Sequence, residues 1–245
     1  MTDTTVYVLD SDRKSRESVA SLVSTLGYRS KAFGSAEAFL AESELTGPCC
    51  IVTEVRLSGL SGIELIEQLI LEETPPPTVV VTAFADTPLT VRAMRSGAVS
   101  VLDKPWREQD LWEAIRAALA LDVANRQRKL RVDTVRKRIE RLTEEERKVM
   151  DMMIAGKANK VIAVELNMGL RTVEARRHHV FRKIEVDSLA ELVRMVLEAT
   201  LSDENETTAR LRLASHKPRD NWVPSPMLLA PLDVGLTPWQ DVQGR

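Results

Sequence analysis

The 245-residue sequence has few cysteines, few aromatic residues and no long apolar run. Its two cysteines, Cys49 and Cys50, are adjacent and have no nearby cysteine or histidine, which argues against a structural disulfide or a metal cage. No apolar stretch approaches the roughly 20 residues that a membrane helix needs. The N-terminus lacks the basic start and apolar core of a signal peptide. We therefore expect a cytoplasmic protein with buried thiols, without export or membrane insertion.

The sequence also lacks the patterns of common catalytic sites. It contains no Ser/His/Asp triad context, no cluster of metal ligands and no phosphate-binding loop, so we do not expect an enzyme. The net charge of −2 conceals an asymmetry, because residues 1–120 carry 11 Lys and Arg against 17 Asp and Glu, whereas residues 121–200 carry 18 against 13. An acidic segment followed by a basic one predicts two modules, the second suited to a polyanion.

Strand and helix patterns alternate over residues 1–120. Short apolar, β-branched runs predict five strands, at 5–9, 28–33, 49–53, 78–82 and 98–102. Helical spacing fills the segments between them, and a fifth helix begins near residue 107. Near-continuous apolar strands indicate a parallel sheet covered on both faces. The fold class expected is therefore α/β, a doubly wound five-stranded parallel sheet, with its chemistry at the carboxyl ends of the strands.

Residues 121–141 continue the fifth helix as a helical linker, because they contain neither Gly nor Pro. An apolar stripe runs along it at steps of three and four residues, formed by Val132, Val135, Ile139 and Leu142. This stripe fits either a solvated linker helix or helix pairing, including a dimeric coiled coil.

Residues 142–200 predict an all-α domain of four helices, at about 144–155, 160–166, 171–184 and 188–200. Thr143 and Glu146 have the spacing of a capping box, which marks the start of the first. A tight turn at 167–169 precedes the third helix, which is heavily basic. Two helices joined by such a turn are typical of a helix-turn-helix.

Residues 201–245 have a different composition. Five of the eleven prolines fall between positions 218 and 238, and no periodicity is sustained, which predicts a disordered or extended tail. Trp222 and Trp239 lie on this segment with Met227-Leu228-Leu229 between them. Docking of the tail on a domain or a partner is therefore the alternative.

Polar side chains follow the strands of the predicted sheet at their carboxyl ends. Asp10 and Ser11 follow the first strand, Glu54 follows the third, Thr82 ends the fourth and Lys104 follows the fifth. Two carboxylates, hydroxyls and a lysine at one sheet edge could bind Mg²⁺ and an anion. The alternative is a charged rim that only solubilises the sheet edge.

These motifs carry a resemblance to a known family. The order Val-Leu-Asp10, then Glu54-Val-Arg-Leu-Ser-Gly, Val-Thr82-Ala and Leu-Asp-Lys104-Pro resembles the receiver domain of bacterial response regulators. The segments from Leu142-Thr-Glu-Glu-Glu-Arg and Arg171-Thr-Val-Glu-Ala resemble the LuxR-type helix-turn-helix. Together, over about residues 1–200, they resemble the FixJ branch of two-component transcriptional regulators. The resemblance implies a homodimer that binds double-stranded DNA, with a possible contact to RNA polymerase.

Three residues depart from what the resemblance implies. Ser11 stands where a second Mg²⁺-binding carboxylate is expected, Glu54 where the phosphoacceptor is an aspartate, and Val101 where the family has an aromatic switch residue. Thr82 and Lys104 match the family pattern. The departures predict a degenerate phosphoacceptor pocket, a pseudo-receiver that works independently of phosphorylation.

The physical consequences concern charge and reach. Mg²⁺ prefers octahedral oxygen ligands with carboxylate charge, so a serine in place of an acid leaves at most a residual, weakened site at Asp10 and Glu54. Asp12 is one residue further along the loop and is a possible substitute. We therefore expect no cofactor, or only weakly held Mg²⁺. Glu54, one methylene longer than aspartate, is expected to pair with Lys104 and to accept a hydrogen bond from Thr82.

The basic helix at 171–184 carries four Arg and one Lys against a single Glu, with an apolar stripe for burial. A DNA-binding helix is the interpretation favoured here over a merely solvated face. Carried over from the family, the residues that face base edges are Glu174, Ala175 and His178. Those expected at phosphates are Arg171, Thr172, Arg176, Arg177, Arg182 and Lys183, with Lys157 and Lys160 adding backbone contacts from the preceding segment.

The leading hypothesis is a sequence-specific DNA-binding regulator with a pseudo-receiver. Its alternatives are a conventional phosphorylated response regulator that tolerates Glu54, and a protein-interaction adaptor acting through the receiver and the tail.

Overall fold

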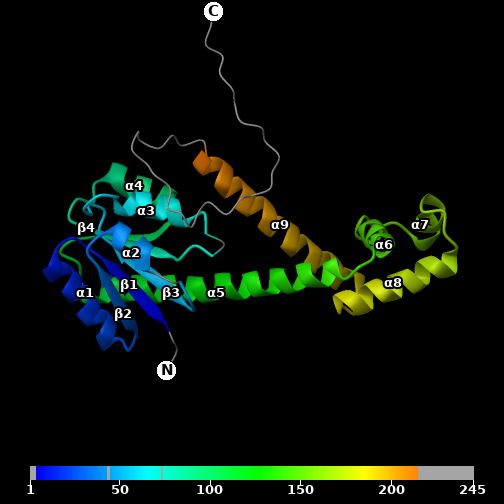
Figure 1. Cartoon of the computed structure of the whole chain (residues 1–245), viewed down its shortest axis with the longest axis horizontal. Helices are drawn as coiled ribbons and strands as arrows, with labels where there is room; N and C mark the ends of the chain where they lie inside the picture. Colours follow the sequence, from blue (N-terminus) through cyan, green and yellow to red (C-terminus); the bar gives the residue numbers. More distant parts are fainter. Residues whose placement is uncertain (1–3, 43–44, 73, 215–245) are drawn as a thin grey trace, which may run out of the picture.

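The computed structural model describes residues 4–42, 45–72 and 74–214, with side chains described as far as Leu201. Figure 1 shows two domains joined by one long helix. The first domain contains β1 (Thr5–Leu9), α1 (Arg13–Thr25), β2 (Arg29–Phe33), α2 (Ala36–Glu42), β3 (Cys49–Thr53), α3 (Gly62–Leu69), β4 (Thr78–Thr82), α4 (Thr87–Arg95) and β5 (Ala98–Asp103). The long helix is α5 (Glu108–Glu140), and α6 (Glu144–Ile154), α7 (Asn159–Glu165), α8 (Leu170–Ile184) and α9 (Leu189–Ala214) follow it.

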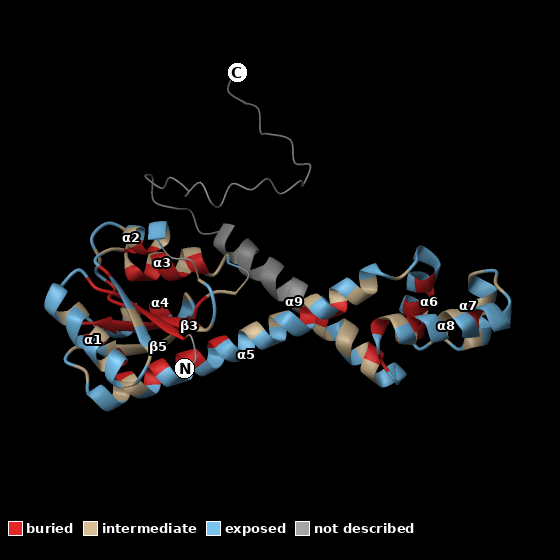
Figure 2. Ribbon diagram, turned by 60° about the horizontal axis from the view of Figure 1, so that its bottom comes forward, coloured by how far each residue is buried: buried red, intermediate tan, exposed pale blue. Residues whose placement is uncertain are grey.

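The five strands form one parallel sheet in the order β2-β1-β3-β4-β5, which confirms the predicted fold class. Successive side chains of a strand point to opposite faces. Val6 and Val8 pack with α1 and α5, whereas Tyr7 and Leu9 pack with α2 and α3. Every residue of β1, β3 and β4 is buried, in agreement with the near-continuous apolar runs of the sequence (Figure 2).

Helix α5 is fixed to the sheet by a buried carboxylate. Asp122, whose side chain has no exposed surface, accepts a hydrogen bond of 2.9 Å from the backbone N–H of Cys49 at the start of β3. Arg126 pairs with the same carboxylate at 2.7 Å. Both cysteines are free and buried, and burial raises the pKa of Cys49 to about 11. The strand start and the first turns of the linker are therefore held together.

The apolar stripe of the linker contacts another helix of the same chain. Val132 and Val135 form a buried cluster with Ala199 of α9, and Met195 of α9 packs beside them. Figure 1 shows α9 crossing α5 and running back toward the sheet domain. Of the two alternatives left open for this stripe, the structure supports helix pairing, within one chain, and contradicts a solvated linker face.

The structure of the second domain agrees with the predicted helix-turn-helix except at the end of its last helix. Thr143 and Glu146 form the predicted capping box of α6, and Asn167 takes a positive φ of 51° in the turn between α7 and α8. The prediction was wrong at the last helix, which continues to Ala214 instead of ending at Thr200. Residues 201–214 contain no Pro or Gly, so nothing in the sequence ends the helix there. The remaining tail, with Trp222 and Trp239, lies outside the described residues.

Candidate functional site

The carboxyl ends of the strands bring the predicted pocket residues together. Asp10 and Glu54 follow the paired strands β1 and β3, and the backbone N–H of Glu54 donates to Leu9 O at 2.9 Å. The backbone N–H of Lys104 donates to Thr82 O at 2.8 Å, which fixes the end of β5 beside the end of β4. A lysine and two carboxylates distant in sequence therefore meet at one edge.

Lys104 lies between the two carboxylates. Its ammonium nitrogen is 2.6 Å from Asp10 Oδ2 and 2.8 Å from Glu54 Oε2. The lysine side chain is 20% exposed, and those of the two acids are 8% and 9% exposed. Burial acts to lower the pKa of Lys104, but the hydrogen bonds to Asp10 and Glu54 outweigh it, so the pKa is raised above its ordinary value. The ammonium form therefore persists at neutral pH, as the predicted pairing of Glu54 with Lys104 requires.

Every oxygen of these two carboxylates accepts a hydrogen bond. Asp10 Oδ1 accepts from the backbone N–H of Asp12 at 2.9 Å, and Asp10 Oδ2 accepts from the hydroxyl of Ser15 at 2.6 Å as well as from Lys104. Glu54 Oε1 accepts from the backbone N–H of Val55 at 2.8 Å. The pocket satisfies its own charges with donors from the protein.

Ser11 and Asp12 have structural partners elsewhere. The hydroxyl oxygen of Ser11 accepts from the backbone N–H of Ser58 at 3.0 Å, which ties the loop after β1 to the loop after β3. Asp12 caps α1 by accepting from the backbone N–H of Ser15 at 2.8 Å. The suggestion that Asp12 substitutes for the missing acid is therefore not supported, because its carboxylate is used at the helix end.

Two further predicted pocket residues are Thr82 and Val101. The hydroxyl of Thr82 accepts from the backbone N–H of Phe84 at 3.3 Å, and within the described residues it makes no hydrogen bond to Glu54, contrary to expectation. Val101 lies half-buried on β5 against the cluster under α3 and α4, where its side chain packs as an aliphatic core residue.

Sequence reasoning missed three contributors to the pocket. Ser15 hydrogen-bonds Asp10 from α1, and the backbone N–H of Arg56 donates to Glu54 Oε1 at 3.4 Å. Gly62 begins α3 so close to Glu54 that a Cβ there would lie 2.3 Å from the Glu54 carbonyl oxygen, so glycine is required for this approach. The spacing of these residues in the sequence gives no signal of their contacts.

Helix α8 presents a mixed polar and cationic surface. Its buried stripe consists of Val173, Val180 and Ile184. The predicted base-facing residues are all exposed, namely Glu174, Ala175 and His178. Arg171, Thr172 and Arg182 are exposed as well, Lys160 is exposed on α7, and Arg177 is half-buried.

Three predicted phosphate contacts have partners inside the domain. Arg176 pairs with Glu145 of α6. Lys183 lies 2.6 Å from the buried carboxylate of Glu146. Lys157 lies 2.5 Å from Glu165. Arg176 and Lys183 hold α8 against α6, and Lys157 ties the loop before α7 to that helix. These three cations therefore do not extend freely into solvent, a distinction that charge counting along one helix does not make.

The sequence comparisons agree with this arrangement. Residues 6–116 match the response regulator receiver domain, and residues 140–196 match the luxR family of bacterial regulatory proteins. The chain is 34% identical over 199 residues to the transcriptional regulatory protein FixJ of Bradyrhizobium diazoefficiens, covering 81% of this chain and 97% of FixJ. It is 34% identical over 190 residues to the response regulator protein TodT of Pseudomonas putida, covering 78% and 84%. The solved structure of the response regulator StyR matches with a TM-score of 0.69 at 38% identity, covering 80% and 99%.

The chain belongs to the FixJ-like family of two-domain response regulators. In this FixJ-like regulator, the receiver match ends within α5 and the luxR match begins at the last residue of α5, so α5 is both the final receiver helix and the connection to the DNA-binding domain. Among the helices of the described residues, none has the length and apolar character needed to cross a membrane. The alignment with FixJ leaves 46 residues of this chain unmatched.

Proposed function

We propose that this transcriptional response regulator has a pseudo-receiver, in which the Glu54 carboxylate pairs with Lys104 in place of a phosphoryl group and which works independently of phosphorylation. The observation that carries the proposal is the position of Lys104 between Asp10 and Glu54, at 2.6 Å and 2.8 Å. Glu54 stands where the family resemblance places an aspartate acceptor, and its longer side chain brings the carboxylate to the ammonium.

The pocket gives a physical reason for this assignment. An acyl phosphate on Glu54 would require its Oε2 to leave Lys104 and its Oε1 to leave the backbone N–H of Val55. The carboxylate charge left to hold the Mg²⁺ that accompanies a phosphoryl group is then low. The position after Asp10 is a serine, and its hydroxyl already accepts a hydrogen bond from the backbone N–H of Ser58. Formation of the phosphorylated state therefore replaces satisfied interactions with poorer ones.

The donor set does not fit a tightly held Mg²⁺ ion. That ion requires near-octahedral oxygen ligands and substantial carboxylate charge. Asp10 and Glu54 already share a cation, and the next acid, Asp12, caps α1. Within the described ranges, no group of three or more His, Cys, Asp or Glu residues is arranged to hold a metal. We therefore propose that Mg²⁺ is held only weakly or not at all.

The output that we propose is sequence-specific binding of duplex DNA by α8. Glu174, Ala175 and His178 are exposed and can reach base edges, and the exposed cations Arg171 and Arg182 suit phosphates.

We propose that two chains bind two half-sites about one helical turn apart, and that the bound dimer contacts RNA polymerase. Since the linker stripe is covered by α9, the pairing surface must lie elsewhere. Light scattering of the protein with and without a bound duplex tests the dimer, and a strict 1:1 complex on a long natural site would contradict it.

The phosphorylation proposal is tested with a small acyl-phosphate donor and Mg²⁺. The unmodified chain is expected to keep its mass and its DNA affinity. The double variant Ser11→Asp with Glu54→Asp restores both acids and is expected to gain phosphate, whereas each single variant remains unmodified because metal and acceptor are both needed. Stoichiometric, Mg²⁺-dependent phosphorylation of the unmodified chain at Glu54 would show a conventional response regulator. Failure of the purified chain to bind any duplex at low salt would instead favour an adaptor.

A further inference from the structure

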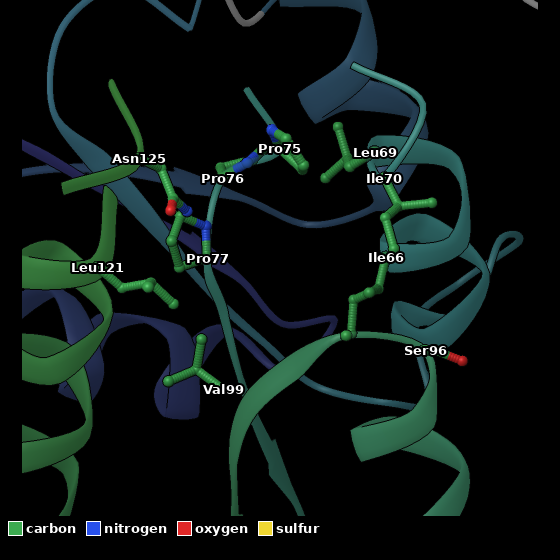
Figure 3. Close-up of a pocket in the computed structure, with 11 residues that line it drawn as sticks. Ile66, Leu69, Ile70, Pro75, Pro76, Pro77, Ser96, Val99, Leu121 and Asn125 are labelled. Carbon is green, nitrogen blue, oxygen red and sulfur yellow. The ribbon is translucent and has the colours of Figure 1, made fainter. Parts of the chain in front are cut away.

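An apolar groove lies at the opposite edge of the receiver sheet from the Lys104 pocket. It has a volume of about 160 Å³ and is lined by the end of α3, by three consecutive prolines and by the turn of α5 that contains Leu121 and Asn125 (Figure 3). Ile66 and Ile70 form one wall, Pro75–Pro77 form the back, and Leu121 and Asn125 form the wall on α5. Since prolines restrict the backbone, this groove is largely preformed.

The groove has the composition of a site for one large amphipathic side chain. Leu121 is 43% exposed at its rim, an apolar surface that the described residues leave uncovered. Asn125 is exposed beside it, and its side-chain amide has no hydrogen-bond partner in the described part of the chain. An apolar wall next to one free amide oxygen matches the indole of tryptophan, which combines a large apolar surface with a single N–H donor.

This chain has a segment of that chemistry after the part that matches its family. The luxR match ends at residue 196, and α9 extends to Ala214, running back over α5 toward the receiver domain (Figure 1). The 31 residues after Ala214 include Trp222, followed by Pro224, Pro226 and Met227-Leu228-Leu229. Trp222 is the eighth residue after Ala214, and eight residues of extended chain span up to about 27 Å.

We propose that residues 218–232 of the same chain dock on this groove, with Trp222 as the side chain whose size and single N–H donor suit the space beside Leu121 and Asn125. Docking joins the end of α9 to the receiver. Because α9 also packs on α5, the tail restricts the position of the DNA-binding domain relative to the receiver.

The test uses tryptophan fluorescence of the full chain and a double-mutant cycle. Leu121→Glu places a charge at the rim of the groove, where the exposed position tolerates substitution. It is expected to shift tryptophan emission to longer wavelength and to increase quenching by acrylamide, because Trp222 becomes exposed. In a Trp222→Ala background the same substitution is expected to cause neither change, whereas in a Trp239→Ala background both changes remain. Leu130→Glu, at a position of α5 that is 67% exposed and outside the groove lining, is the matched control and should change nothing.

Three results would overturn the proposal. The first is no spectral change with Leu121→Glu in a chain whose circular dichroism matches the unmodified protein. The second is the same change with and without Trp222, which would assign it to Trp106, Trp112 or Trp239. The third is a signal that disappears on dilution, which would assign the groove to the tail of a second copy.

Discussion

The ammonium nitrogen of Lys104 lies 2.8 Å from a carboxylate oxygen of Glu54, although the two residues follow different strands. The parallel pairing of β1, β3, β4 and β5 brings these strand ends to one edge, and the second carboxylate, Asp10, completes the group. A charge network that is mostly buried and fully hydrogen-bonded depends on every member, because removal of one leaves the others without a partner.

Lys104→Met is therefore expected to lower the free energy of unfolding by about 2–4 kcal/mol, since two neighbouring carboxylates lose their cation in a mostly buried site. Urea denaturation of the full chain, monitored by circular dichroism, measures the loss. The matched control is Arg107→Met, whose ion pair with Asp110 is at the surface, with 84% of the arginine side chain exposed. Equal losses of unfolding free energy in the two variants would show that the Lys104 network stabilises the fold no more than a surface ion pair does.

The Lys104 contribution has a defined pH window. The folded-state pKa of Lys104 is raised above the ordinary value of 10.5, so its stabilising contribution is complete below that value and is lost as the pH rises through the folded-state pKa. The difference in unfolding free energy between the unmodified chain and Lys104→Met should therefore stay constant from about pH 7 to pH 9 and shrink above about pH 10.5. A difference that vanishes between pH 7 and 9 would contradict this assignment.

The second prediction concerns the contact between α6 and α8. Burial acts to raise the pKa of Glu146, but hydrogen bonds from Lys183 and from the Thr143 backbone outweigh it and lower the pKa. This carboxylate therefore stabilises the domain above its ordinary pKa of 4.5, and the contribution is lost as the pH falls through the lowered value. Lys183→Met is expected to destabilise the domain by about 1–3 kcal/mol at pH 7, with a smaller difference in acid. Lys148→Met, which breaks an exposed pair with Glu144, is the control expected to have little effect.

The third prediction separates DNA contacts from structural ion pairs on α8. Arg182 is exposed, whereas Arg176 is paired with Glu145 and its side chain is only 23% exposed. Arg182→Ala should weaken binding to all duplexes and reduce the slope of log affinity against log salt by about 0.9. Arg176→Ala should mainly lower the melting temperature of the domain and leave the slope nearly unchanged. Fluorescence anisotropy at several salt concentrations measures both variants, and a slope change confined to Arg176→Ala would reverse the assignment.

The fourth prediction concerns the connection of α5 to the sheet. Asp122→Ala removes the acceptor for the Cys49 backbone N–H and leaves Arg126 without its partner, so unfolding free energy should fall by about 3–5 kcal/mol. Asp133→Ala, further along α5 in a partly exposed pair with Lys129, is the matched control. Thermal unfolding of both variants distinguishes them, and a loss below about 1 kcal/mol for Asp122→Ala would refute the role of this carboxylate as an anchor.

The sequence alone was sufficient for the α/β fold class, the order of its elements and the helix-turn-helix. These features follow from local chemistry, because apolar runs, capping residues and glycine stops act within a few residues of chain. The convergence of Asp10, Glu54 and Lys104 was also predictable, since parallel strands place their carboxyl ends at one edge. The predicted end of α9 at Thr200 was wrong, because helix-compatible residues continue past that position without a stop signal.

Only the tertiary structure decided which charged and apolar side chains have partners. It pairs Arg176 with Glu145 and Lys183 with Glu146, places Ser15 on Asp10, and covers Val132 and Val135 with Ala199. Each of these contacts depends on the angle and offset at which two helices or loops meet. Periodicity along one segment gives the face that is apolar or charged, but the partner of that face is set by the packing of the whole chain.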